Sequence, residues 1–82
     1  MVKVRVFATL RGIVGKSELE VQAGTVGELL EKLYSEYPRM KKELEKGVVI
    51  LVNGKNIEHL EKLNTKLKDE DVVSIFPPVG GG

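Results

Sequence analysis

The first twenty-two residues carry two short patterns of alternating apolar and polar side chains. Between Val2 and Phe7 every second residue is a valine, which is the two-residue period of a half-buried strand. Leu19 and Val21 alternate with polar residues in the same way. The segment between them, residues 10–16, contains two glycines and predicts a turn. Residues 2–22 are therefore predicted to form a β-hairpin.

A helical pattern begins at Thr25, whose hydroxyl can accept a hydrogen bond from a free backbone N–H. Glu28, three residues later, completes the sequence of a capping box. The apolar residues that follow at helical spacing are Val26, Leu29, Leu30, Leu33 and Tyr37. We expect Pro38 either to end this helix or to start a new turn, because proline disfavours helical geometry in the residue before it. Residues 40–46 predict a short second helical segment, closed by Gly47.

Residues 48–52 are five consecutive aliphatic residues. A run of this kind predicts a central strand that is covered on both faces. Asn53 and Gly54 follow it and form a strong signal for a tight turn. Residues 55–57 can therefore pair back as a short strand at the edge of the sheet.

The last part of the domain has one further strand pattern. Residues 59–68 predict irregular structure or a single helical turn, and residues 72–76 predict the final strand. Pro77 and Pro78 stop this strand, because proline has no N–H for the sheet ladder. One main helix on one face of a mixed sheet makes an α+β fold, and a β-grasp is its most economical form at this length. We expect a β-grasp domain over residues 1–76 and a flexible, extended tail over residues 77–82.

Composition excludes several classes of function. The 82 residues suffice for one domain, and the absence of cysteine excludes disulfides, cysteine-ligated metals and side-chain thiol chemistry. Thirteen basic and twelve acidic residues give a net charge of +1, which makes no case for nucleic acid or a membrane surface as a partner. The longest apolar run is far shorter than the ~20 residues that span a bilayer, and the N-terminus does not look like a signal peptide. We therefore expect a soluble, cytoplasmic protein.

No constellation of catalytic side chains is evident. The sequence Gly15-Lys16-Ser17 copies the end of a phosphate-binding loop, but Leu10 stands where that motif needs its first glycine. The spacing of Gly12 and Gly15 imitates an RNA-clamping loop, which would have to join two helices. His59 is the only histidine and has no evident partner for a metal site or a catalytic triad. We expect no metal site.

The end of the chain is chemically unusual. After Pro77, Pro78 and Val79 the sequence finishes on Gly80, Gly81 and Gly82. An extended path at ~3.1 Å per residue would carry the tail roughly 19 Å from the sheet. Glycines lack a Cβ, so such a tail can enter a narrow channel that other residues would block. The alternative interpretations are a frayed terminus or a cloning remnant.

Strand parity predicts a second feature near the tail. If the valines of the first strand face the helix, Phe7 faces outward, and Ser74 places Phe76 on the same outer face. The aliphatic run 48–52 must also turn two or three side chains to that face. An exposed apolar patch beside a tail indicates a surface where a partner protein docks. The alternative is that a loop or a second copy of the chain covers it.

These features resemble the MoaD/ThiS family of ubiquitin-like sulfur carriers, and above all the small subunits of molybdopterin synthase. The segments that carry the resemblance are Val4–Phe7-Ala8 with Leu10-Arg11 and Gly15, Thr25-Val26-Gly27-Glu28-Leu29-Leu30, Val52-Asn53-Gly54, and Phe76-Pro77-Pro78-Val79 with Gly81-Gly82. The resemblance covers essentially the whole chain, and the proline and glycine signature at the end is its most specific part. The sequence departs from the family at Gly80, where Ala or Ser is common, and in residues 67–71, which lack the usual glycine.

The resemblance implies a mechanism that needs no side-chain chemistry. The Gly82 carboxylate, with an ordinary pKa near ~3.5, is unreactive at neutral pH. An E1-like adenylyltransferase would adenylate it with ATP and Mg²⁺, and a persulfide from a sulfur donor enzyme would replace AMP to leave a thiocarboxylate. Pro77 to Gly81 would thread the tail into the large subunit of molybdopterin synthase, where the sulfur passes to a pterin precursor of the molybdenum cofactor. Phe7 and Phe76 would anchor docking. The chain itself would bind no cofactor, and a sulfur carried on the terminus agrees with the absence of cysteine.

Two other readings remain open at this point. The same activation chemistry would serve a sulfur carrier for tRNA thiolation or a ubiquitin-like, small archaeal-type modifier that is joined to lysines. A third possibility from a different class is a passive β-grasp interaction module whose terminal glycines have no role.

Overall fold

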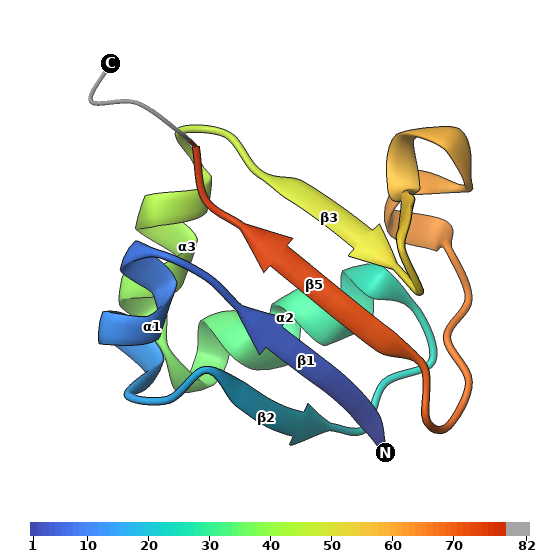
Figure 1. The fold of residues 1–82 in the computed structure, drawn as a ribbon, viewed down its shortest axis with the longest axis horizontal. Helices are drawn as coiled ribbons and strands as arrows, with labels where there is room; N and C mark the ends of the chain where they lie inside the picture. Colours follow the sequence, from blue (N-terminus) through green and yellow to red (C-terminus); the bar gives the residue numbers. More distant parts are fainter. Residues whose placement is uncertain (79–82) are drawn as a thin grey trace.

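The core of the fold is a five-stranded mixed sheet with the strand order β2-β1-β5-β3-β4 (Figure 1). The computed structural model describes residues 1–78. Its strands are β1 (Val2–Val6), β2 (Glu18–Val21), β3 (Val49–Val52), β4 (Lys55–Asn56) and β5 (Val72–Phe76). Strands β1 and β5 run parallel in the centre, and the other neighbouring pairs are antiparallel. This confirms the predicted hairpin and the last strand. The predicted edge strand 55–57 is confirmed for Lys55–Asn56 only, because Ile57 begins a 3-10 helix.

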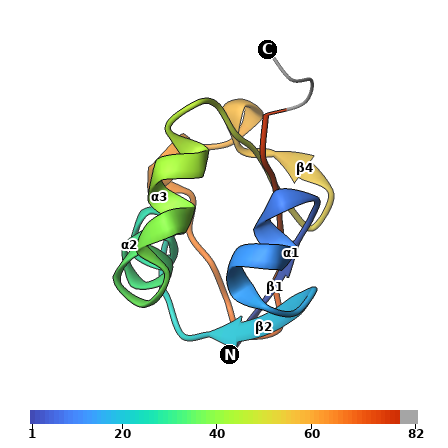
Figure 2. The ribbon, with the colours of Figure 1, turned by 90° about the vertical axis from the view of Figure 1, so that its left-hand side faces the viewer.

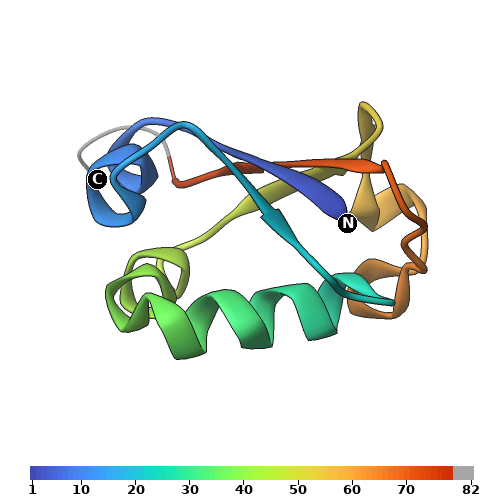
Figure 3. The same cartoon turned by 90° about the horizontal axis from the view of Figure 1, so that it is seen from below.

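Helices cover one face of the sheet (Figure 3). They are α1 (Thr9–Val14), α2 (Val26–Glu36), α3 (Pro38–Leu44) and the short 3-10 helices η1 (Ile57–His59) and η2 (Lys62–Asn64). The inward side chains Val4, Val6, Val73 and Ile75 are completely buried, as is Leu29 of α2. Within residues 1–78 no helix lies over the other face of the sheet, so the fold is an α+β arrangement of two layers, as predicted.

Helix α2 begins with the predicted cap. The Thr25 hydroxyl accepts a hydrogen bond from the Glu28 N–H at 3.1 Å. The Glu28 carboxylate in turn accepts a hydrogen bond from the Gly24 N–H at 2.6 Å, one residue before the position that a standard capping box uses. The second helical segment was predicted over residues 40–46 but starts at Pro38, because proline is well tolerated in the first turn of a helix.

The predicted turn over residues 10–16 is wrong, because most of this segment forms helix α1. Leu10 and Val14 are four residues apart, and the helical turn brings both into the core. Gly15 then ends the helix in the left-handed conformation at φ 88°, with its N–H bonded to the Arg11 carbonyl at 2.7 Å. The two glycines gave a turn signal that concealed this single apolar pair.

The prediction that residues 48–52 are covered on both faces is also wrong. Val49 is 46 % exposed and Leu51 is partly exposed, whereas Ile50 and Val52 are buried. The alternation arises because the helices cover only one face of β3. In residues 59–68 the structure has parts of two 3-10 turns, η1 and η2, where irregular structure or one turn was expected.

No helix in the described part of the chain combines the length and the apolar character needed to cross a bilayer.

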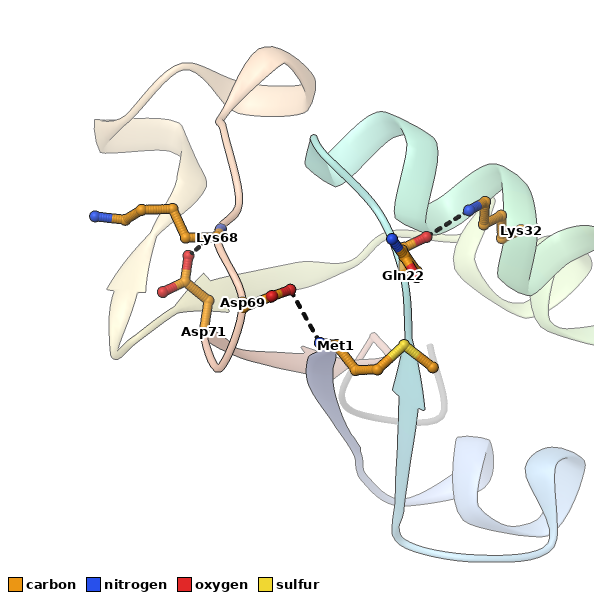
Figure 4. A network of polar contacts seen from close by, with 6 residues as sticks. All are labelled: Met1, Gln22, Lys32, Lys68, Asp69 and Asp71. Carbon is orange, nitrogen blue, oxygen red and sulfur yellow. Dashed lines mark hydrogen bonds and ion pairs between the residues drawn. The ribbon is translucent and has the colours of Figure 1, made fainter.

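Asp71 links the loop before β5 to the turn after β3. Its carboxylate accepts a hydrogen bond from the Lys68 N–H at 2.8 Å (Figure 4) and another from the Asn53 side-chain amide at 3.0 Å. The Lys68 bond, followed by the Asn53 bond, holds the pKa of Asp71 below its ordinary value. Asp69, two residues earlier, instead pairs with the N-terminal amine of Met1 at 3.0 Å (Figure 4).

We expect Asp71→Ala to lower the free energy of unfolding by about 1–2 kcal/mol at neutral pH, because two hydrogen bonds to a charged group are lost. A lowered folded-state pKa means that this stabilisation is complete above the ordinary carboxyl pKa of about 3.9 and disappears as the pH falls through the lowered value. The free energies of unfolding of the wild type and of Asp71→Ala, measured with denaturant, should therefore become equal in acid. Asp69→Ala is the matched control and should cost less than about 1 kcal/mol, since its ion pair is exposed. Equal losses of unfolding free energy in Asp71→Ala and Asp69→Ala would contradict the stabilising role of the Asp71 hydrogen bonds.

Candidate functional site

The outer face of the sheet holds a stacked pair of aromatic rings at one end of the central strands. The Phe7 and Phe76 ring centroids lie 4.3 Å apart with an interplanar angle of 10°. The pair forms because β1 and β5 are parallel neighbours in which Val6 is paired with Ile75, so the next residue of each strand meets on the outer side. This confirms that both rings face outward, and each is half-buried by the other.

Strand β3 extends this apolar surface. Val49 is paired with Phe76, and Leu51 is paired with Ser74. Paired residues point to the same side of a sheet, so both aliphatic side chains lie on the outer face. We call Phe7, Val49, Leu51 and Phe76 the aromatic patch. Its exposed carbon surface is of the kind that partner proteins cover.

Two arginines border the patch. The alternation of residues 2–7 predicts that Arg5 faces outward with Phe7, which is confirmed, whereas Arg11 lies in the segment predicted to be a turn and was missed. The guanidinium carbons of Arg5 and Arg11 lie 5.8 Å and 5.4 Å from the centre of the Phe7 ring, within the range of a cation–π contact. Arg11 also donates from Nε to the Val6 carbonyl at 3.2 Å. The sequence signal for Arg11 is its position four residues after Phe7, which becomes visible once α1 is known to be a helix.

The base of the tail lies directly beside the patch. Pro77 follows Phe76 and is buried, and Pro78 is half-buried. A Cβ added at Gly47, after α3, would sit 3.7 Å from the Pro78 Cβ, so α3 ends next to the base of the tail. The predicted tail residues Val79, Gly80, Gly81 and Gly82 lie outside the described residues. Their threading and reactive roles stay predictions.

Residues 1–78 contain no cluster of side chains equipped for catalysis. His59 lies in η1, exposed, and no group of three or more His, Asp or Glu side chains in this range could hold a metal ion. The pKa of Tyr34 is raised by burial first and by the Glu45 carboxylate second, and burial similarly raises the pKa of Tyr37. Both phenols therefore stay protonated and neutral at physiological pH.

The ThiS family profile matches residues 4–82. The chain is 39% identical to small archaeal modifier protein 3 of Haloferax volcanii, with 98% of this chain and 97% of that protein aligned. It is 38% identical to the molybdopterin synthase sulfur carrier subunit of Mycobacterium tuberculosis over 82% of this chain and 76% of that protein.

Solved structures agree with these relatives. Small archaeal modifier protein 1 from Methanosarcina acetivorans has a TM-score of 0.86 and 42% identity, covering 99% of this chain and 95% of that one. A chain of the BexX/CysO complex from Amycolatopsis orientalis has a TM-score of 0.85 and 26% identity, with all of both chains covered. The profile match, the identities and the shared ubiquitin-like fold lead to one conclusion: the chain belongs to the ThiS family of β-grasp proteins.

Proposed function

We propose that this protein is a sulfur carrier that is activated at its C-terminal Gly82 and serves as the small subunit of molybdopterin synthase. The observation that carries the proposal is the extent of the family match, which runs from the first strand to the final glycine. Within the described residues no group of three or more His, Asp or Glu side chains could hold a metal ion. A chain without cysteine can bear sulfur on its terminal carboxyl and needs no side chain for it.

The activation proceeds in three steps. The Gly82 carboxylate attacks the α-phosphorus of ATP on an E1-like adenylyltransferase, which forms an acyl-adenylate and releases pyrophosphate. A persulfide on the sulfur donor enzyme then displaces AMP to give an acyl disulfide. A second thiol reduces that disulfide, becomes oxidised to a disulfide with the donor, and leaves the Gly82 thiocarboxylate. ATP and Mg²⁺ act on the adenylyltransferase, and this chain contributes the carboxylate and the surface that presents it.

The aromatic patch supports the docking half of this proposal. Aromatic side chains are enriched among the residues that dominate binding energy, above all when they sit together in a patch that becomes desolvated. Phe7 and Phe76 lie next to Pro77, so a partner that covers the rings is placed over the base of the tail. The large subunit of molybdopterin synthase would receive the thiocarboxylate in this way and transfer its sulfur to a pterin precursor.

A second candidate is favoured by specific relatives. The Haloferax volcanii and Methanosarcina acetivorans proteins are small archaeal modifiers and align with nearly the whole chain. In that role the same acyl-adenylate would be attacked by a lysine amine of another protein, forming an isopeptide bond and releasing AMP. A carrier for tRNA thiolation would use the same activated terminus. All three roles share the first step.

We expect the purified chain to become activated when it is incubated with its E1-like partner, ATP and Mg²⁺. Intact-mass spectrometry should show the adenylate, and after addition of a sulfur donor and thiol it should show one oxygen exchanged for one sulfur. The exchange should map to the terminal peptide and should require ATP. An unchanged mass under these conditions, with a known carrier of the same partner as positive control, would identify a passive interaction module.

The acceptor is decided by a second incubation. With the large subunit of molybdopterin synthase and the pterin precursor, the thiocarboxylate form should regenerate the carboxylate and yield a dithiolene. With cell extract and ATP, a modifier should instead give a ladder of larger conjugates that contain this chain, and a tRNA carrier should give thiolated tRNA. The first outcome supports the molybdopterin assignment, and either of the others without it overturns that assignment.

A further inference from the structure

Basic residues are concentrated at one end of the molecule. The segments 9–16 and 38–47, which contain α1, α3 and the loops after them, hold six basic and two acidic residues. The rest of the chain has seven basic and ten acidic residues. A net charge of +1 therefore conceals a positive end and a negative remainder, and the sequence-based argument from net charge could not detect the difference.

Three of these cations form a cluster on α3 and just after it. Arg39, Lys42 and Lys46 line an open groove of about 330 Å³ together with Ile13 of α1. Glu43, the fifth residue of the groove, pairs with Lys46 at 3.6 Å and accepts a hydrogen bond from the Thr9 hydroxyl at 3.4 Å. Within residues 1–78, Arg39 and Lys42 take part in no ion pair. We call Arg39, Lys42 and Lys46 the α3 cation cluster.

Two cations of the cluster are neighbours without a partner of opposite charge. Arg39 and Lys42 are three residues apart on α3, so like charges lie on one side of the helix, an arrangement that slightly destabilises it. Glu43 lies in the same groove but pairs with Lys46. A binding partner of opposite charge would offset the repulsion between Arg39 and Lys42.

The cluster lies at the end of the sheet where the tail begins. Figure 2 shows α1 and α3 side by side at the end of the molecule that faces the viewer, and β5 reaches its C-terminus at the same end. Gly47, which follows α3, lies so close to Pro78 that an added Cβ would be 3.7 Å from the Pro78 Cβ, so this loop lies beside the base of the tail. Arg11 of α1 continues the positive charge to the edge of the aromatic patch, where it covers the Phe7 ring. Asp69, Glu70 and Asp71 lie at the opposite end of the sheet (Figure 1).

We propose that the E1-like partner, which receives the tail for adenylation, presents an acidic surface around its entry channel, which the α3 cation cluster and Arg11 bind. This inference rests on the proposed function, because it assumes that the tail enters a partner. The apolar patch supplies contact area, and the cations steer and orient the approach so that the base of the tail faces the channel. RNA, bound through its phosphate backbone, is the other macromolecule that such a cluster could bind. The acidic protein is favoured because the cluster adjoins the apolar patch, and phosphate backbones offer no counterpart to exposed Val49 and the stacked rings.

The test compares two double variants that change net charge equally. Arg39→Glu with Lys42→Glu reverses the α3 cation cluster, and Lys55→Glu with Lys66→Glu reverses two exposed lysines away from it. Initial rates of ATP-dependent activation by the E1-like partner give kcat/KM for each. At low salt we expect the α3 variant to lose about tenfold or more, as electrostatic steering allows, and the control to lose much less. The difference should vanish between about 0.01 M and 1 M salt, where the Debye length falls from about 30 Å to about 3 Å.

Each outcome is decisive. Normal activation of the unmodified chain, with equal kcat/KM for the two variants or with a deficit that persists at high salt, overturns this inference and leaves the proposed function standing. No activation of the unmodified chain overturns both. Unchanged activation of the α3 variant together with lost binding to tRNA in a filter assay assigns the cluster to RNA and overturns the acidic-partner proposal. Thermal unfolding of both variants checks that their folds are intact.

Discussion

Deletion of Gly82 is expected to lower ATP-dependent activation by at least about 100-fold while the fold stays intact. The shortened chain still ends in a carboxylate, but that carboxylate lies roughly 3.1 Å nearer the sheet in an extended tail. Adenylation requires the attacking oxygen within about 3–3.5 Å of the phosphorus, and a displacement of even ~1 Å can cost about 10²-fold. In the proposed complex the partner could not follow the shortened tail, because docking of the aromatic patch would fix where the base of the tail lies.

Thermal unfolding supplies the structural control for this deletion. The buried core of the described residues extends from Val2 to Ile75, so loss of Gly82 removes none of it and the Tm should not move. Gly80→Ala is the matched tail variant, since it adds one methyl group and leaves the length of the tail unchanged, and it should keep most of the activity. Adenylate or thiocarboxylate forming at the wild-type rate on the shortened chain would refute the assignment of Gly82 as the reactive residue.

The periodic elements of the fold could be predicted because their patterns are long or strictly alternating. The valines of β1 and the capped apolar stripe of α2 each indicate one structure only. Helix α1 has a single buried pair, Leu10 and Val14, and two glycines in or beside it, so its turn signal outweighed its helix signal. The run at residues 48–52 lacks polar positions, and nothing local could reveal that only one face of β3 is covered.

The candidate site also has features that could be predicted from the sequence and features that could not. Strand parity is a local property, so the outward direction of Phe7 and Phe76 could be predicted. That the two rings stack depends on β1 and β5 being parallel neighbours, which is a property of the whole topology. The positions of Arg11 and of the α3 cation cluster depend on where two short helices pack. A net charge near zero gave no reason to look for them.

The largest effect on docking is expected from the stacked rings. Phe7→Ala and Phe76→Ala should each weaken binding to the E1-like partner and to the large synthase subunit by about 2 kcal/mol or more, which is roughly thirtyfold in Kd. The reason is that truncation removes anchor area at the centre of the patch and frees the remaining ring from its stack. Since the rings touch at 4.3 Å, the double variant should lose less than the sum of the single losses.

The effects of these variants on stability and on docking must be measured separately, because the stacked pair also contributes about 0.5–1.5 kcal/mol to the stability of the fold. Titration calorimetry at a temperature well below the Tm of each variant measures binding of folded protein only. Leu63→Ala is the control: Leu63 is 52 % exposed, lies beside Gly27 of α2 and therefore belongs to the helical layer, away from the patch. It should leave both Kd values within about twofold, the ±0.5 kcal/mol scale of an ordinary surface change. Phe7→Leu retains apolar area without the ring and should fall between wild type and Phe7→Ala. Wild-type affinity in both alanine variants would mean that partners approach the tail from another face.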